Sequence, residues 1–130
     1  SIASDGPLTV FGVGSPHPRT YGTFARVLGS YVRERNIISL EEAIRKMTSL
    51  PARILSINKR GLIKEGYYAD ITVFDSRAII DKATFEDPHQ YAEGIHSVIV
   101  NGVIVVEQGV HNGNKPGKVL RGPGYISDNE

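Results

Sequence analysis

The stretch IHSVIVNGVIVVEQG, residues 95–109, constrains the fold of this chain more than any other part of the sequence. Two runs of β-branched residues surround Asn101-Gly102, a dipeptide that suits a two-residue turn with both φ angles positive, so the pattern predicts a β-hairpin there. ADITVFD, residues 69–75, predicts another strand of the same sheet, and Leu62-Ile63 predicts a short one. A small apolar sheet of this kind has open edges and faces, so we expect it to need partner strands that this sequence does not supply.

Helical periodicity precedes the strands. Over residues 21–35 the apolar residues recur at spacings of one, three and four, which predicts an amphipathic helix with Thr20 or Thr23 as its N-cap. Gly22 and Gly29 lower the helix propensity by about 1 kcal/mol each relative to Ala. We therefore expect tertiary packing, and not propensity, to hold this helix.

A second helix is predicted over ISLEEAIRKMTSL, residues 38–50. Ser39 and Glu42 have the spacing of a capping box, in which each side chain satisfies a backbone amide of the other residue. The predicted buried stripe consists of Leu40, Ala43, Ile44 and Met47. Pro51 suits the first turn of a further short helix, because its φ angle is already helical.

The order of a loop, helices and then strands predicts an α+β layout within this chain. Residues 76–94 are polar and irregular, with Phe85 and Tyr91 as the expected anchors, and the chain from Val110 onward is expected to be mostly coil. We divide the sequence into residues 1–57, residues 58–121 and a flexible tail over residues 122–130.

The composition narrows the range of possible functions. The 130 residues suit one domain, and 15 Lys plus Arg against 14 Asp plus Glu give a net charge of +1, which argues against nucleic acid as a partner. No apolar run is long enough to span a membrane and no secretory signal is visible. The chain has no cysteine, which excludes thiolate ligands and fits a reducing compartment, so a cytoplasmic location is expected. The sequence starts with Ser1 in mid-element, as expected for a processed N-terminus or a piece of a longer chain.

Chemistry-bearing residues gather around a glycine- and proline-rich loop at the start of the chain. Asp5 follows a short apolar stretch and precedes a glycine, as acids do where a barrel strand feeds its loop, and such a carboxylate ligates a metal or moves a proton. Arg19, beside His17, suits a bidentate grip on a carboxylate or phosphate. The alternatives are a surface turn at residues 4–6 and solvated side chains at His17 and Arg19. On the residues alone, both interpretations stay open.

The remaining motifs give weaker evidence of a functional site. His89, His96 and His111 lack the mutual spacing of a metal motif and are interpreted as structural or solvated. GVGSP, residues 12–16, lacks the lysine of a phosphate-binding loop, and nothing brackets a nucleophilic serine.

Four segments together resemble the C-terminal part of N-acyl-D-amino-acid deacylases (D-aminoacylases), zinc-dependent members of the amidohydrolase superfamily. They are SDG, HPRTYGTFARVLGSYVRERNIISLEEAIRKMTSLPARILSI, RGLIKEGYYADITVFD and ATFEDPHQYAEGIHSVIVNGVIVVEQG. GLIKEGYYADITVFD is common to many amidohydrolases, whereas HPRTYGTFARVL and FEDPHQYAEGI point to the D-aminoacylase branch. The resemblance runs from residue 1 to about residue 121.

The resemblance implies a (β/α)8 barrel that carries the metal site and a small β-sandwich built from both chain ends. Residues 1–57 would supply the end of the last barrel strand, the active-site loop and the helices after it. Residues 58–121 would supply the C-terminal strands of the sandwich.

The resemblance also assigns roles to three residues. Asp5 matches the strand-eight aspartate that contacts the metal centre and carries the proton from the attacking water to the leaving amine. Arg19 matches the arginine that clamps the α-carboxylate of the substrate, and His17 shapes the same loop. The implied cofactor is zinc, but the family's other metal ligands, including its His-x-His, are absent from this sequence.

The sequence therefore predicts the C-terminal portion of a zinc-dependent N-acyl-D-amino-acid deacylase, present as a fragment, a cleavage product or a separate subunit. Its expected partners are the missing N-terminal barrel portion and a small-molecule N-acyl-D-amino acid, and the chain alone is expected to be inactive. One alternative is another cyclic-amide or urea hydrolase of the superfamily. The other is a non-catalytic interaction domain that keeps only the tail of the fold and associates through its sheet edges.

Overall fold

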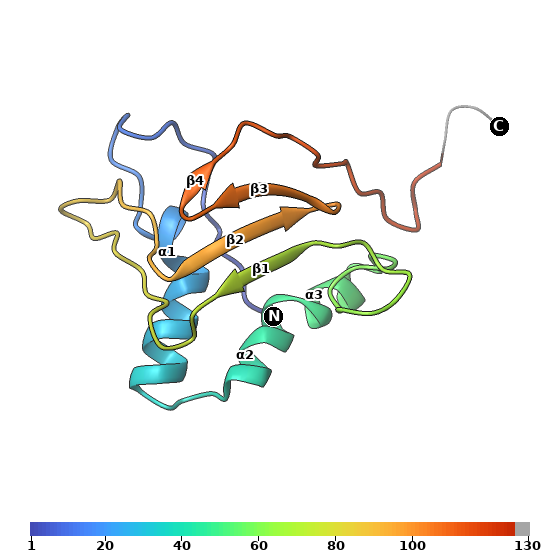
Figure 1. Cartoon of the computed structure of the whole chain (residues 1–130), viewed down its shortest axis with the longest axis horizontal. Coiled ribbons are helices and arrows are strands. Elements are labelled where there is room, and N and C mark those ends of the chain that lie inside the picture. Colours follow the sequence, from blue (N-terminus) through green and yellow to red (C-terminus); the bar gives the residue numbers. More distant parts are fainter. Residues whose placement is uncertain (127–130) are drawn as a thin grey trace.

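The structure, a computed structural model, describes residues 1–126. An irregular N-terminal segment leads into the helices, and the strands follow, so the predicted α+β order is confirmed (Figure 1). The elements are α1 (Arg19–Arg26), the π-helical segment η1 (Val27–Glu34), α2 (Leu40–Met47), α3 (Ser49–Ile54), β1 (Ile71–Phe74), β2 (Ile95–Val100), β3 (Val103–Glu107) and β4 (Val110–His111). None of the helices within residues 1–126 has both the length and the apolar character needed to cross a bilayer.

The four strands form one antiparallel sheet in the order β1-β2-β3-β4. The predicted hairpin is confirmed: β2 and β3 pair, and Asn101 and Gly102 turn the chain with φ angles of 48° and 80°. The register shifts by one residue between Val98 and Ile99, where a bulge lies in the ladder.

One prediction about the strands was wrong. Leu62-Ile63 forms no strand: the segment is a loop that closes locally through a hydrogen bond from the Tyr68 amide to the Lys59 carbonyl (2.9 Å), and Ile63 is exposed. From Val110 onward the chain is mostly coil, as predicted, since residues 112–126 form no helix or strand. The exception is β4: the φ angles of the preceding two residues, 50° and 79°, make a second tight turn that returns β4 against β3. Of the predicted tail, residues 127–130 lie outside the described residues.

The first predicted helix is confirmed, but its cap is not a threonine. The helix begins at Arg19, and the imidazole Nδ1 of His17 accepts a hydrogen bond from the Arg19 backbone N–H (3.1 Å). The Thr23 hydroxyl instead donates to the Arg19 carbonyl (2.8 Å) within the helix. The second half of the helix, η1, is wider than an α-helix; at its end, for example, the Arg35 amide donates to the Ser30 carbonyl, five residues earlier (3.0 Å).

Tertiary packing explains the two glycines in this helix. A Cβ atom on Gly22 would meet the Cβ of Asp81 at 2.7 Å, and one on Gly29 would meet the Ile79 carbonyl oxygen at 2.7 Å. The loop between β1 and β2 therefore lies directly on the helix backbone. Its anchor is Ile79, which is 2% exposed, and not Phe85 or Tyr91, which are 71% and 63% exposed. The predicted anchors were wrong because aromatic size does not determine which side of a loop packs inward.

The second helix is capped as expected on one side of the capping box. The Ser39 hydroxyl accepts from the Glu42 amide (3.2 Å), whereas the Glu42 carboxylate pairs with Arg45 and Lys46. Hydrogen bonding to the Arg45 guanidinium lowers the pKa of Glu42 to about 2. The predicted stripe is confirmed, with Ala43 fully buried and the other three residues packed against the core. The short helix after it begins at Ser49, two residues before the proline.

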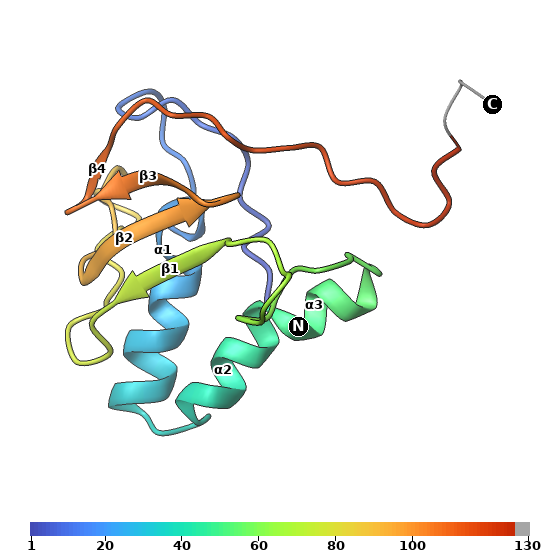
Figure 2. The ribbon, with the colours of Figure 1, turned by 45° about the vertical axis from the view of Figure 1, so that its right-hand side comes forward.

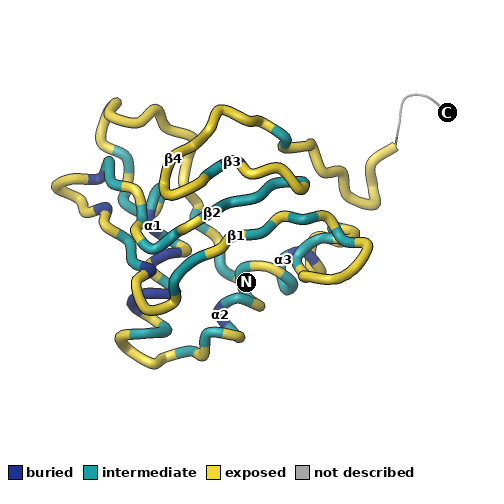
Figure 3. Tube along the Cα trace, in the orientation of Figure 1, coloured by how far each residue is buried: buried dark blue, intermediate teal, exposed yellow. Residues whose placement is uncertain are grey.

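The core lies where the helices, the β1–β2 loop and one face of the sheet meet. It centres on Ala25, Leu28, Ala43 and Ile79, with Phe74 and Ile95 of the sheet packed against them. Figure 2 shows α1 behind the sheet and α2 and α3 beyond the β1 edge. Figure 3 shows that the strands are mostly intermediate or exposed, and that the buried positions gather along α1 and the segments beside it. The sheet is thus undercovered, as its apolar composition predicted.

Candidate functional site

The predicted catalytic acid lies in a turn that rests on the first helix. Asp5 has a φ of 48°, and the Gly6 amide donates to the Ser4 hydroxyl (3.3 Å), so residues 4–6 make a local side-chain hydrogen bond of the ST-turn kind. A Cβ on Gly6 would meet the Cα of Thr20 at 3.0 Å, so the absence of a side chain lets the turn approach the start of α1. The turn thereby presents Asp5 to the first residue of that helix.

Asp5 and Arg19 are brought together. Oδ2 of Asp5 and Nη2 of Arg19 are 2.9 Å apart, and both side chains are accessible, with 86% and 43% of their surfaces exposed. A guanidinium has five N–H donors, and this ion pair involves one terminal nitrogen. The fork of Arg19 therefore keeps donors for a second anion beside the Asp5 carboxylate.

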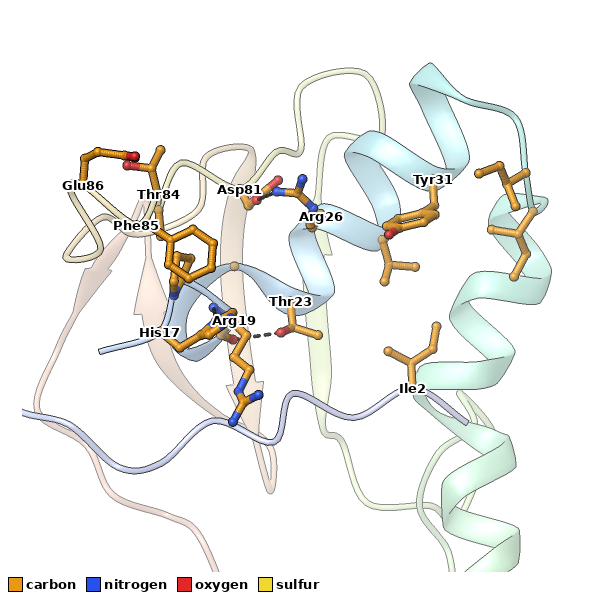
Figure 4. Close-up of a pocket in the computed structure, with 16 residues that line it drawn as sticks. Ile2, His17, Arg19, Thr23, Arg26, Tyr31, Asp81, Thr84, Phe85 and Glu86 are labelled. Atoms are coloured by element: carbon orange, nitrogen blue, oxygen red, sulfur yellow. Dashed lines mark hydrogen bonds and ion pairs between the residues drawn. The ribbon is translucent and has the colours of Figure 1, made fainter. Parts of the chain in front are cut away.

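His17 stands at the same end of α1 but faces another way. Its Nδ1 accepts from the amide of Arg19, the first residue of the helix, and its ring packs edge-on against Phe85 with 4.9 Å between centroids. Figure 4 shows Phe85 over His17, while the Arg19 side chain extends toward the N-terminal segment. The structure thus brings Asp5 and Arg19 together and places His17 beside them, at the start of α1.

A cavity of about 700 Å³ opens next to His17 and Arg19, between α1 and the loop that follows Asp81. His17 and Arg19 line one part, and apolar side chains line another, among them Ile2, Val27, Tyr31, Ile37 and Ile38. Arg26 and Asp81, 2.8 Å apart, form an ion pair on its wall, and the Asp81 side chain is 9% exposed. Arg19 therefore belongs both to the cavity lining and to the ion pair, whereas Asp5 is not among the lining residues.

His89 has a contact near this site that its place in the sequence does not indicate. His89 was interpreted as structural or solvated, and both of its ring nitrogens make hydrogen bonds to the N-terminal loop. No spacing rule could have found this contact, because its partners lie 75 and 77 residues away in the sequence. The His89-containing motif FEDPHQY was singled out only as a mark of resemblance.

The described part of the chain does not form a metal site by itself. Among residues 1–126 there is no group of three or more His, Cys, Asp or Glu side chains placed to hold a metal ion. Asp5 offers one carboxylate, and that carboxylate is paired with Arg19. A zinc ion needs three or four protein ligands, so a single exposed acid does not hold it alone.

With this geometry in place, comparison with known proteins decides the family. A model of the amidohydrolase family matches residues 1–106. The chain belongs to the amidohydrolase family. The chain spans only about a fifth of the length of the deacylases that it matches, 22% for the two described next.

Two curated relatives come from Alcaligenes xylosoxydans xylosoxydans. D-aminoacylase is 48% identical over 105 residues, which is 81% of this chain, and N-acyl-D-glutamate deacylase is 45% identical over 106 residues, which is 82% of this chain. Among amidohydrolases, the sequence resemblance to the deacylase branch is therefore confirmed.

Two solved structures resemble the chain in three dimensions. A D-aminoacylase structure that addresses the functional role of a binuclear metal centre is 49% identical with a TM-score of 0.80, covering 82% of this chain and 22% of that one. The N-acyl-D-glutamate deacylase of Bordetella bronchiseptica, complexed with zinc and a phosphonate mimic of the tetrahedral intermediate, is 46% identical with a TM-score of 0.77 and the same coverage. The fold of this chain is thus the fold of the corresponding part of those amidohydrolases.

Proposed function

We propose that this chain is the C-terminal portion of a metal-dependent deacylase that hydrolyses N-acyl-D-amino acids to a carboxylate and a free D-amino acid. The similarity to three deacylases of D-amino-acid derivatives over four fifths of the chain supports this substrate class. The observation that carries the proposal within the chain is the Asp5–Arg19 ion pair at 2.9 Å.

The geometry of this pair suits an N-acyl amino acid. In such a substrate the α-carboxylate and the amide nitrogen are attached to the same carbon atom. An Arg19 that holds the α-carboxylate would therefore bring the amide nitrogen close to Asp5, where a proton is needed as the amine leaves. A carboxylate and an arginine in contact thus supply the clamp and the proton carrier for one substrate.

In this proposal each residue has one role. Asp5 takes a proton from the attacking water and delivers it to the leaving amine. Arg19 binds the α-carboxylate through the part of its fork that Asp5 does not occupy. His17 holds the first turn of α1 through its bond to the Arg19 amide, and so fixes the direction in which the guanidinium leaves the helix.

The rest of the enzyme would supply what this chain lacks. We propose that residues 1–57 complete a (β/α)8 barrel, that residues 58–121 complete a β-sandwich, and that residues outside this chain bind zinc, with at most one ligand from Asp5. When bound, the metal would activate the attacking water. Because residues 1–126, which the structure describes, hold no metal site of their own, we expect the isolated 130 residues to be inactive.

The test compares the isolated chain with the complete polypeptide. Zinc content by elemental analysis and hydrolysis of N-acetyl-D-amino acids, with their L-enantiomers as controls, are measured for both. We expect stoichiometric zinc and D-selective hydrolysis only in the complete protein. One tightly bound zinc per isolated chain, or a complete protein that hydrolyses cyclic amides but no N-acyl-D-amino acid, would contradict the proposal.

A further inference from the structure

The segment that joins Asp5 to His17 has no regular secondary structure and carries exposed apolar side chains. Leu8, Val10 and Val13 are each at least 64% exposed, and Gly12 and Gly14 have positive φ angles at its tip. We call residues 6–16 the site loop. A loop with so few internal contacts stays in one place only if something outside it binds its backbone.

His89 binds that backbone from the opposite half of the chain. The Gly12 amide donates to Nδ1 of His89 (3.1 Å), and Nε2 of His89 lies 2.9 Å from the carbonyl oxygen of Gly14. A carbonyl only accepts and an amide only donates, so both bonds form together only in the neutral tautomer with its proton on Nε2. One imidazole thus grips both sides of the loop tip.

Aromatic side chains connect His89 and the loop tip to α1, the helix that carries Arg19. The Tyr21 hydroxyl lies 3.1 Å from Nδ1 of His89 and 3.3 Å from the hydroxyl of Thr9. Phe11, at the loop tip, stacks on Tyr91 with 4.8 Å between centroids and meets Tyr21 edge-on at 6.0 Å. Because Tyr21 is two residues from Arg19 on α1, the same helix supports both the tip of the loop and the Arg19 side chain.

His89 itself is held in place by its own segment. The Asp87 amide donates to the Thr84 hydroxyl (3.0 Å), and the Gln90 side chain donates to the carbonyls of Lys82 and Asp87 (3.0 Å each). Pro88, next to His89, is buried. The imidazole therefore projects from a braced turn and not from a free coil.

We propose that His89 is the positioning residue of the site loop, which fixes the distance and direction between Asp5 and Arg19 for the reaction. The inference rests on the proposed function, since it gives the loop its catalytic purpose. His89 touches neither Asp5 nor Arg19, and it acts through the loop tip and Tyr21. Its loss would free the middle of the loop while the ion pair still joins the two ends.

The test uses His89→Ala, His89→Asn and His89→Gln in the complete protein. Asn retains an acceptor near the place of Nδ1, and Gln retains a donor near the place of Nε2. His96→Ala, at an exposed position on β2, is the matched control. Hydrogen exchange of a peptide covering residues 7–16, the melting temperature, and kcat and KM for an N-acyl-D-amino acid are measured for each.

We expect His89→Ala to speed exchange in residues 7–16 and to lower kcat/KM by about 10²-fold, the loss typical of a misplaced catalytic group. Asn and Gln should each recover part of both properties, and His96→Ala should match the wild type. Unchanged exchange in His89→Ala would overturn the inference whatever the activity. Faster exchange with wild-type kinetic constants would overturn the link between the loop and the reaction. Faster exchange in a protein whose wild type has no deacylase activity would instead refute the proposed function and leave the anchor standing.

Discussion

Oδ2 of Asp5 and Nη2 of Arg19 lie 2.9 Å apart, so an ion pair joins the chain just before the site loop to the first residue of the helix after it. The pair is solvent-accessible, and exposed ion pairs contribute little to stability. Under the proposed function we therefore expect the two groups to act on the substrate, and substitutions can test each of them separately.

Asp5→Asn in the complete enzyme should lose turnover by more than ~10²-fold, the lower end of what general acid–base groups contribute, and should keep KM near the wild-type value. Asn is nearly isosteric with Asp but accepts no proton from water. Steady-state kinetics on an N-acyl-D-amino acid decides the matter. Turnover within threefold of the wild type would mean that Asp5 is only a turn residue.

Arg19→Lys should chiefly raise KM, because a point charge replaces a planar fork that holds two oxygen atoms. The matched control is the substrate and not a second variant. A substrate with an amidated α-carboxylate should bind poorly to the wild type and be nearly indifferent to the change. If acid and amide substrates respond equally, the clamp lies elsewhere.

Gly22→Ala should destabilise the fold although Ala favours helices. The added Cβ would lie 2.7 Å from the Cβ of Asp81, and overpacking of this kind costs about 1–3 kcal/mol against a propensity gain of about 1 kcal/mol. We expect a lower melting temperature in thermal unfolding. Gly117→Ala, at a site with open space, is the control and should leave the melting temperature unchanged. A more stable Gly22→Ala variant would show that the β1–β2 loop does not pack on α1.

Gly102→Val should cost on the order of 1 kcal/mol or more, because a β-branched residue resists the φ of 80° that the hairpin turn requires. No atom lies within 4 Å of the added Cβ, so the penalty reports the backbone angle and not a clash. Gly117→Val shares the open space without the positive φ and should be nearly neutral. Denaturant unfolding of the two variants gives the difference, and equal stabilities would argue against the turn.

Asp70→Asn should remove part of the acid sensitivity of the fold. Partial burial raises the pKa of the Asp70 carboxyl, but hydrogen bonds from the Asn101 amide (2.8 Å) and the Arg60 guanidinium outweigh it and hold the pKa below its ordinary value of 3.8. A lowered pKa in the folded state stabilises the fold above the ordinary value, and this contribution is lost as the pH falls through the folded-state pKa. Denaturant unfolding at a series of pH values should show wild type and variant converging below that range. A constant difference would contradict the assignment.

The sequence by itself determined the features that depend on neighbours along the chain. Asn101-Gly102 specified the hairpin because only residues tolerant of positive φ close so short a turn. Ser39 specified the start of α2 because its hydroxyl reaches an amide three residues on. The resemblance in the HPR and FEDPHQY segments led to the deacylase branch and to Asp5 and Arg19 as a pair of interest.

Only the tertiary structure decided what those residues meet. Gly22 lowers the helix propensity of the sequence, but in the fold its missing side chain leaves room for Asp81. Phe85 and Tyr91 were the anchors by size, yet Ile79 fills the core because the loop turns that side toward α1. His89 grips a loop 75 residues away, a contact that no local spacing encodes, since it exists only after the helices and the sheet have brought the two segments together.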